Sequence, residues 1–317
     1  MTRASSIQPL FLLGATGVGK SAAGMEVSRT WGNTAILCLD AMQAYRGADI
    51  GTSKPTAAER AEIPHGGLDL VNLGERFDVA QYLAHAADFL RAQREAGRRV
   101  IVVGGTGLYF RALTRGLCEA PQGADELRAE LAKLSVEQLR ARLEKVDAPM
   151  LAQIDVQNPR RLARAIEVME ATGKSLRDWQ DETPEPVVKD FTALWLQREK
   201  EELHTRIEKR VEAMFAVGWE DEVRALIAKR GREKVVAFPG IGYREIAEAM
   251  DPRGQVRSQV QPGNGDTTKG NILVATRQYA KRQLTWFARE PKLAPVMLTG
   301  HPSFSAALRA AALPPLF

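Results

Sequence analysis

The sequence predicts an α/β fold, in which a parallel β-sheet carries helices on both faces and a mainly helical insertion interrupts the chain. In the first third, short apolar runs at 9–13, 35–39 and 100–103 alternate with longer helical patterns. Buried strands separated by helices are typical of a parallel sheet. From about residue 124 to 179, helical patterns instead follow one another without a strand signal. The chain therefore combines a sheet-based core with a helical insertion.

The elements of the first third follow from its apolar runs and its glycines. In order we expect a strand in PLFLL (9–13), a helix at 21–31 that stops near Gly32, a strand in AILCL (35–39), a helix at 79–96 closed by Gly97, a strand in VIVV (100–103), and a helix opened by GGTGLYFRAL.

The insertion contains the clearest helix boundaries of the chain. Asn158 stands at an N-cap position, Pro159 at the first helical position and Gly173 just past the end. We place the core domain at 1–117 and 191–317, and the insertion at 118–190. In the remainder we expect strands at 191–196 and 294–300, helices at 199–217, 220–230, 243–250 and 271–290, an exposed loop at 251–268, and a terminal Ala-rich helix.

Composition restricts the class of protein. The 317 residues are 44% hydrophobic and 26% charged, as in ordinary globular proteins. No apolar run is long enough to cross a membrane. Cys38 and Cys118 form no CxxC pair, which fits a reducing cytosol, so we expect a cytoplasmic protein. The four histidines show no metal-ligand spacing.

The positive charge is local. The net charge is +5, and residues 269–292 alone hold six lysines and arginines against one acid, Glu290. A basic segment of this kind points to an anionic partner more strongly than the small net charge does.

The stretch GATGVGKS (14–21) fits the phosphate-binding pattern GxxxxGK[ST], with a predicted strand before it and a helix after it. Its glycines allow backbone N–H groups to turn toward an anion at the start of the helix, and Lys20 adds positive charge. Ser21 offers a hydroxyl to Mg²⁺. The alternative is a glycine-rich turn without a ligand, but the strand-loop-helix context favours a fold of the P-loop NTPase type.

Polar groups follow two further strands. Asp40 comes directly after the second strand and Thr106 follows Gly104 and Gly105 after the third. Ligands bind at the carboxyl ends of parallel strands, so both side chains are candidates for the site. Asp40 there can accept a proton or reach a metal through water. The alternatives are a carboxylate that caps a turn and a turn that needs unusual backbone angles.

Two basic segments suggest a surface for nucleic acid. RRLAR (160–164) puts positive charge at a helix N-terminus, where the helix dipole disfavours it, so an external anion is one explanation and pairing with Glu167 the other. ATRQYAKRQLTWFARE (275–290) alternates basic residues with aromatic residues. This combination suits contact with phosphates and stacking on nucleobases. For the aromatic residues a place in the core is the better explanation, because Leu284, Phe287 and Ala288 stand at helical spacing, whereas for Lys281 and Arg282 we favour nucleic acid.

Taken together, six blocks resemble the bacterial tRNA dimethylallyltransferases, also called tRNA isopentenyltransferases. In order they are DAMQAYRGADIGTSKP (40–55), IPHGGLDL (63–70), VVGGTGLYFRAL (102–113), NPRRLARAIEV (158–168), GIGYREI (240–246) and TRQYAKRQLTWF (276–287). The resemblance covers residues 9 to about 290.

This resemblance implies transfer of a dimethylallyl group from dimethylallyl diphosphate to N6 of the tRNA adenosine just 3′ of the anticodon, with Mg²⁺ required and diphosphate released. The phosphate loop would hold a leaving group rather than a nucleotide. Asp40 would be the general base, with Thr106 and Lys20 beside it, and the target base would flip into the site. We also expect a monomer, because tRNA needs an open channel.

The resemblance assigns binding residues position by position. The diphosphate set is Gly14, Ala15, Thr16, Gly17, Val18, Gly19, Lys20, Ser21 and Arg224. The tRNA set is Asp40, Ala41, Met42, Gln43, Thr106, Arg128, Arg160, Arg161, Leu162, Ala163, Arg164, Pro239, Gly240, Ile241, Gly242, Tyr243, Arg244, Lys281, Arg282, Gln283, Leu284, Thr285, Trp286, Phe287 and Ala288.

The chain departs from the family pattern at a few positions. Ala15 replaces a proline of the loop, Ala41 a common serine beside Asp40, and Gly107 a bulkier residue. None of these removes a group that the chemistry needs.

Three rival functions remain open at this point. A small-molecule P-loop kinase does not account for the basic helix or the insertion. An adenylate isopentenyltransferase would not need the tRNA-contacting segments. A nucleic-acid-binding scaffold leaves Asp40 and Thr106 without a role.

Overall fold

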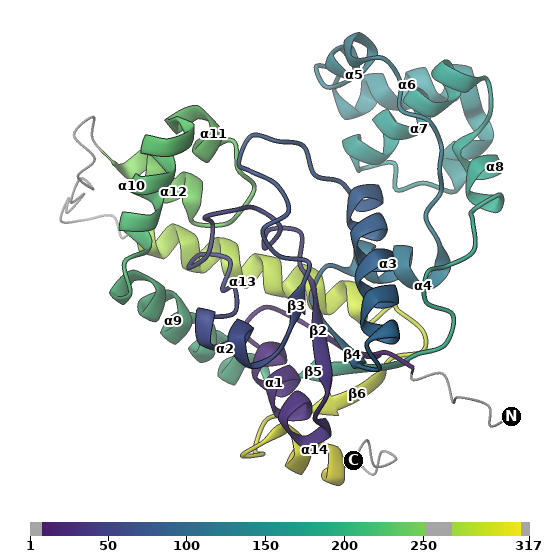
Figure 1. The fold of residues 1–317 in the computed structure, drawn as a ribbon. Helices are drawn as coiled ribbons and strands as arrows, with labels where there is room; N and C mark the ends of the chain where they lie inside the picture. Colours follow the sequence, from purple (N-terminus) through teal and green to yellow (C-terminus); the bar gives the residue numbers. More distant parts are fainter. Residues whose placement is uncertain (1–7, 251–267, 312–317) are drawn as a thin grey trace, which may run out of the picture. The chain divides into compact units, whose positions relative to one another are not determined.

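The computed structural model describes residues 8–250 and 268–311. The chain divides into two compact units, residues 1–110 with 188–317 and residues 111–187. The larger unit contains a six-stranded sheet with the strand order β3-β2-β4-β1-β5-β6, in which all neighbours run parallel (Figure 1). The strands are β1 Leu10–Gly14, β2 Thr34–Leu39, β3 His65–Gly66, β4 Arg99–Gly104, β5 Thr192–Gln197 and β6 Ala294–Met297. The predicted α/β fold is confirmed.

Helices follow most of these strands. They are α1 Lys20–Trp31, α2 Ala57–Glu62, α3 Val79–Glu95, α4 Gly107–Arg115, α9 Lys200–Ala216, α10 Trp219–Arg230, α11 Arg232–Val236, α12 Tyr243–Ala249, α13 Thr268–Phe287 and α14 Phe304–Ala310. The loop expected at 251–268 lies outside the described residues except for its last position.

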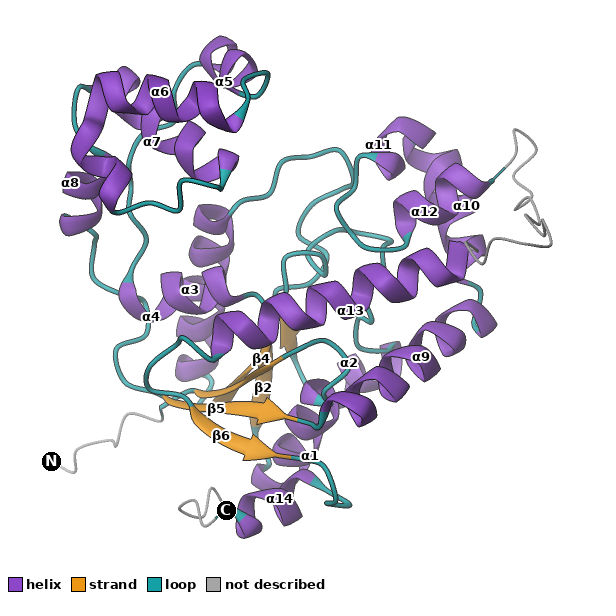
Figure 2. Cartoon of the chain, turned by 180° about the vertical axis from the view of Figure 1, so that it is seen from behind, coloured by secondary structure: helices purple, strands orange, loops and turns teal. Residues whose placement is uncertain are grey.

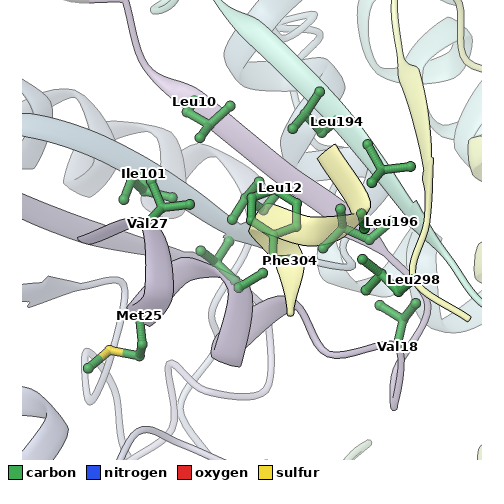
Figure 3. Close-up of a cluster of buried hydrophobic side chains, with 14 of the residues drawn as sticks. Leu10, Leu12, Val18, Met25, Val27, Ile101, Leu194, Leu196, Leu298 and Phe304 are labelled. Carbon is green, nitrogen blue, oxygen red and sulfur yellow. The ribbon is translucent and has the colours of Figure 1, made fainter. Parts of the chain in front are cut away.

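Alternation along the central strand covers both faces of the sheet. Leu10 and Leu12 on β1 face the cluster to which α1 and α14 contribute, with Phe304 from α14 packed among them (Figure 3). Phe11 points the other way, where its ring lies 5.3 Å from the rings of both Phe110 and Phe191. Because side chains alternate across a strand, a run of apolar residues buries both faces, and this explains the uninterrupted PLFLL pattern.

A second cluster of buried side chains lies around α10, α11 and α12. Its centre is Trp219, whose indole lies so close to Gly51 and Gly242 that a Cβ on either glycine would fall within 2.3 Å of the ring. These two glycines are therefore required by the tryptophan that separates them. Helices α9 and α13 run side by side, joined by an ion pair between Glu208 and Arg277 (Figure 2).

The smaller unit is helical throughout. Its elements are α5 Asp125–Leu131, α6 Val136–Asp147, a 3₁₀ turn at Ala148–Ala152, α7 Pro159–Thr172 and α8 Leu176–Asp181. Asn158 caps α7 by accepting hydrogen bonds from Arg160 N and Arg161 N, and Gly173 ends the helix with φ 68°. The predicted boundaries of α7 are thus confirmed. The shorter elements β3, α2, α8 and α11 were not predicted from the sequence.

Candidate active site

The loop between β1 and α1 is shaped by its glycines. Gly17 and Gly19 have φ of 81° and 112°, in the left-handed region that disfavours other residues. A Cβ on Gly14 would lie 2.6 Å from Leu196 O, so the loop passes close against β5. Gly19 supplies no side-chain cap to the first N–H groups of α1. These donors, together with the positive end of the helix, suit an anion.

Lys20 is the first residue of α1, where the loop ends. Its Nζ donates to Ala15 O at 2.8 Å, so the amine folds back over the loop. Burial and the nearby charge of Arg210 lower the pKa of Lys20 to about 7, although the Asp40 carboxylate partly opposes this shift. The side chain is therefore half-charged near neutral pH, and an arriving anion would favour its protonated form.

Three arginines support the loop from outside. Arg198 Nε donates to Val18 O, Arg206 Nε to Gly17 O and Arg210 Nη1 to Thr16 Oγ1, each at 2.9 Å. A Cβ on Gly19 would lie 3.6 Å from Arg206 Nη2, so this guanidinium reaches the same part of the loop. Sequence reasoning missed all three. Arg206 and Arg210 stand four apart in LHTRIEKR, a spacing that also describes a solvated helix face.

Arg224, expected at the diphosphate, lies elsewhere. Its exposed guanidinium pairs with Asp221 on α10, and Arg224 lines neither of the two cavities described below. The structure brings Arg206 and Arg210 to the loop and does not bring Arg224 there.

Asp40 and Thr106 come together as the parallel sheet predicts. Asp40 Oδ1 accepts from Met42 N at 2.9 Å, and Thr106 Oγ1 accepts from Ala41 N at 3.3 Å. Burial raises the pKa of Asp40, against the opposite effects of the Met42 hydrogen bond and of Lys20 and Arg210. The contact at Ala41 uses its main chain, so the missing serine hydroxyl does not break the link between the two strand ends.

Gln283 of α13 joins the loop to the turn before Thr106. Its Oε1 accepts from Thr16 N at 2.8 Å and its Nε2 donates to Gly105 O at 3.0 Å. One turn further along, the Trp286 ring lies over Gly107, where a Cβ would approach it to 2.4 Å. Gly107 is thus explained by the packing of α13 against the start of α4.

The 40–55 segment is held by two charged side chains. The Glu222 carboxylate accepts from Asp49 N, Ile50 N and Gly51 N, and also from the Tyr243 hydroxyl at 2.7 Å. Lys54, only 1% exposed, donates at 2.6 Å to Tyr45 O and to the carboxylates of Asp49 and Asp69. Neither residue was predicted from the sequence.

Two cavities meet at Asp40. The first, of about 430 Å³, extends from the loop over an apolar floor of Met25, Ile36, Cys38 and Val103. The second, of about 320 Å³, lies toward α10 and the 239–241 segment. Both are lined by the same five residues, Thr16, Asp40, Thr52, Arg210 and Tyr279. A ligand in the first cavity can therefore touch a ligand in the second beside the Asp40 carboxylate.

The predicted tRNA contacts fall into separate groups. Those that line the second cavity are Asp40, Ala41, Met42, Thr106, Pro239, Gly240, Ile241 and Arg282, whereas Gln43 and Gln283 line the first, as Asp40 also does. Among those exposed on the surface are Arg160, Arg161, Arg244, Lys281, Thr285 and Ala288.

Other predicted contacts are internal. The side chains of Leu162, Tyr243 and Phe287 are at most 1% exposed, so they stabilise the protein instead of presenting a surface. In the smaller unit the Arg164 guanidinium donates to Ala120 O and Pro121 O and pairs with Glu167 at 3.0 Å. The alternative of pairing with Glu167 is thus confirmed for Arg164. Arg128 pairs with Asp125.

Within residues 8–250 and 268–311 there is no group of three or more His, Cys, Asp or Glu side chains that could hold a metal ion. Ser21 is exposed at the edge of the first cavity. None of the helices in this part of the chain combines the length and apolar character that a membrane span requires.

Comparison with known proteins gives a consistent result. Residues 43–290 match the family model described as IPP transferase. The tRNA dimethylallyltransferase of Methylacidiphilum infernorum is 40% identical over 283 residues, which cover 89% of this chain and 83% of that protein. The corresponding protein of Syntrophobacter fumaroxidans is also 40% identical, over 89% of this chain and 81% of its own length.

Solved structures agree. The tRNA isopentenylpyrophosphate transferase of Bacillus halodurans superposes with a TM-score of 0.64 at 29% identity, over 92% of this chain and 90% of that one. A eukaryotic dimethylallyltransferase acting on tRNA shares the fold with a TM-score of 0.78 at 22% identity, over 96% of this chain and 77% of the other.

Proposed function

The chain belongs to the IPP transferase family and transfers a dimethylallyl group to tRNA. We propose that its two adjoining cavities hold the two substrates of that reaction. The first cavity takes dimethylallyl diphosphate. The second takes the adenine of the adenosine 3′ to the anticodon, flipped out of its loop. The observation that carries this division is the shared wall at Asp40, where the two cavities meet.

The diphosphate lies on the 14–21 loop. Backbone N–H groups at the start of α1, the Lys20 ammonium and the free guanidinium nitrogens of Arg206 and Arg210 surround its oxygens. These groups are fixed before the reaction, so they stabilise the charge that grows on the diphosphate as the allylic C–O bond breaks. Arg206 and Arg210 take the role first expected of Arg224.

The loop also suits Mg²⁺. The described residues offer the Ser21 hydroxyl but no cluster of carboxylates, and Mg²⁺ commonly binds through few protein ligands together with substrate phosphates. Bound there, the ion would neutralise charge on the leaving diphosphate. The protein's own part is to hold that diphosphate in place with Lys20 and the arginines.

Asp40 is the general base. The N6 amine of adenine attacks the allylic carbon, and its proton passes to the Asp40 carboxylate. Burial that raises the pKa of Asp40 makes it a better proton acceptor than an ordinary aspartate. Thr106 fixes the turn after Asp40 through Ala41 N, and its hydroxyl hydrogen is available to the substrate.

The tRNA approaches the second cavity over α13. Lys281 and Arg282 are exposed there, and Arg282 also lines the cavity. The exposed Arg160 and Arg161 of the smaller unit are further candidates for phosphate contact. An open cavity that admits a folded RNA is compatible with a monomer.

The test is incubation of the protein with unmodified tRNA, Mg²⁺ and radiolabelled dimethylallyl diphosphate, with AMP and ATP as parallel acceptors. We expect label in the tRNA, at the adenosine next to the anticodon. Label in AMP and none in tRNA would instead assign the second cavity to a free nucleotide.

A further inference from the structure

Tyr279 stands where the two substrates must meet. It is one of the five residues that line both cavities, and among the described residues it is the only phenylalanine, tyrosine or tryptophan that does so. Trp219, the other such ring in a cavity wall, lines the second cavity alone. The transferring carbon therefore moves past the Tyr279 side chain if the substrates bind as proposed above.

The position of this ring is fixed by its helix. Gln283, one turn further along α13, is bonded to Thr16 N and Gly105 O, and Ala280 next to Tyr279 is buried. On the outer side Arg277 pairs with Glu208 of α9. With α13 bonded to both walls of the site, the Tyr279 side chain is held where it lines both cavities.

The surroundings of the ring keep its hydroxyl protonated. Burial raises the pKa of the Tyr279 hydroxyl, and the negative charge of Asp40 raises it further. The phenol therefore remains protonated and does not compete with adenine as a nucleophile for the allylic carbon. The Arg282 guanidinium carbon lies 5.8 Å from the ring centroid, near the outer limit of a cation–π contact, so the contact is weak.

We propose that Tyr279 is a catalytic residue, whose aromatic face stabilises the positive charge that develops on the dimethylallyl carbons during transfer. The C–O bond to diphosphate breaks and its electron pair leaves with the oxygen. The N6 lone pair forms the new C–N bond, and the N6 proton goes to Asp40. Between these events the allylic group carries cationic character, and the negative face of an aromatic ring attracts a cation. This proposal rests on the division of the cavities proposed above.

The test separates the ring from the rest of the side chain. Tyr279→Phe keeps the ring, and Tyr279→Leu removes it while keeping an apolar group. We expect the single-turnover rate of the phenylalanine variant to stay within about threefold of the parent, and that of the leucine variant to fall about ten- to thirtyfold, because a desolvated cation–π contact is worth roughly that factor.

A fluorinated series removes the question of folding. Phenylalanine with one, two or three ring fluorines at position 279 keeps its shape while the ring face loses negative potential. We expect the single-turnover rate to fall step by step along the series, with unchanged Kd for tRNA. The control is the same series at Phe110, a buried ring that lines neither cavity. Fluorination there should leave the single-turnover rate unchanged.

A flat rate along the series at position 279 would overturn the proposal, as would a leucine variant that turns over like the phenylalanine variant. Those results leave the assignment of substrates intact if the parent protein still labels tRNA. A parent protein that fails to label tRNA contradicts the assignment of substrates itself.

Discussion

Gln283 gives the sharpest test of how the site is built. Substituting Gln283→Ala leaves Thr16 N and Gly105 O without their partner, because the amide bridges them at 2.8 and 3.0 Å. Each buried backbone group left unpaired costs about 1–3 kcal/mol. Gly105 is buried and bears the full cost, whereas Thr16 is half-buried, so water replaces part of its bond. We expect the free energy of unfolding to fall by about 2–4 kcal/mol in total.

Gln278→Ala is the matched control, since Gln278 is exposed on the same helix and an exposed substitution changes stability by about 0.5 kcal/mol or less. Urea unfolding of both variants measures the difference, because the midpoint shifts with stability while the slope stays constant. Diphosphate affinity should also fall in the Gln283 variant, since Thr16 belongs to the loop. If the two variants unfold within about 0.5 kcal/mol of each other, the bridge does not hold the site together.

Four further outcomes are expected. Asp40→Ala should abolish transfer while tRNA binding persists, and retention of most of the turnover in this variant argues against its role as base. In the parent protein, kcat/KM should fall as the pH drops through the raised pKa of Asp40, because the base must be ionised. Since the pKa of Lys20 is about 7, the affinity for diphosphate should weaken by up to about tenfold per pH unit above 7, because the unbound protein loses the Lys20 proton. Calorimetric titration measures this affinity. Lys20→Met is the control, because its pH dependence reports the titration of diphosphate alone. Lys281→Ala with Arg282→Ala should weaken tRNA binding and lower the slope of log Kd against log salt by about 2, whereas an unchanged slope would remove both from the interface. Glu222→Gln should lower the free energy of unfolding by about 2–4 kcal/mol, because one of the two oxygens that accept from Asp49–Gly51 and Tyr243 becomes a donor. The control is Glu233→Gln at an exposed position. If both variants lose the same stability in an unfolding assay, the network around Glu222 is not needed.

Much of the site could be predicted because the sheet is parallel. In such a sheet the strand carboxyl ends share one edge, so the loop after β1, Asp40 after β2 and Thr106 after β4 are neighbours although they are far apart in the chain. The glycine pattern of the loop predicts an anion-binding site, and the apolar runs predict the strands of the sheet. These signals are local in sequence and need no knowledge of packing.

The missed residues depend on contacts between distant elements. Arg206 and Arg210 belong to a helix whose sequence looks like a solvated face, and only its position beside the loop gives them partners. Strand β3 has two residues and exists because Ile36 and Leu37 pair with it. Glu222 lies in an acidic first turn of α10, where an acid is already favoured by the helix dipole, so nothing in the sequence indicates its bonds to the 49–51 segment.

Helix α13 carries a sequence motif of which only some residues are exposed on the surface. TRQYAKRQLTWF indicates an RNA-binding helix, and its exposed positions Lys281 and Arg282 suit that purpose. The opposite face carries Tyr279 at the junction of the cavities and Gln283 on the loop. Because one helix is bonded to the phosphate loop and presents basic side chains to solvent, a displacement of α13 by the RNA would move the Tyr279 ring and the Thr16 amide together. If tRNA binds α13 as proposed, its binding and the geometry of the reacting groups are linked through this one helix.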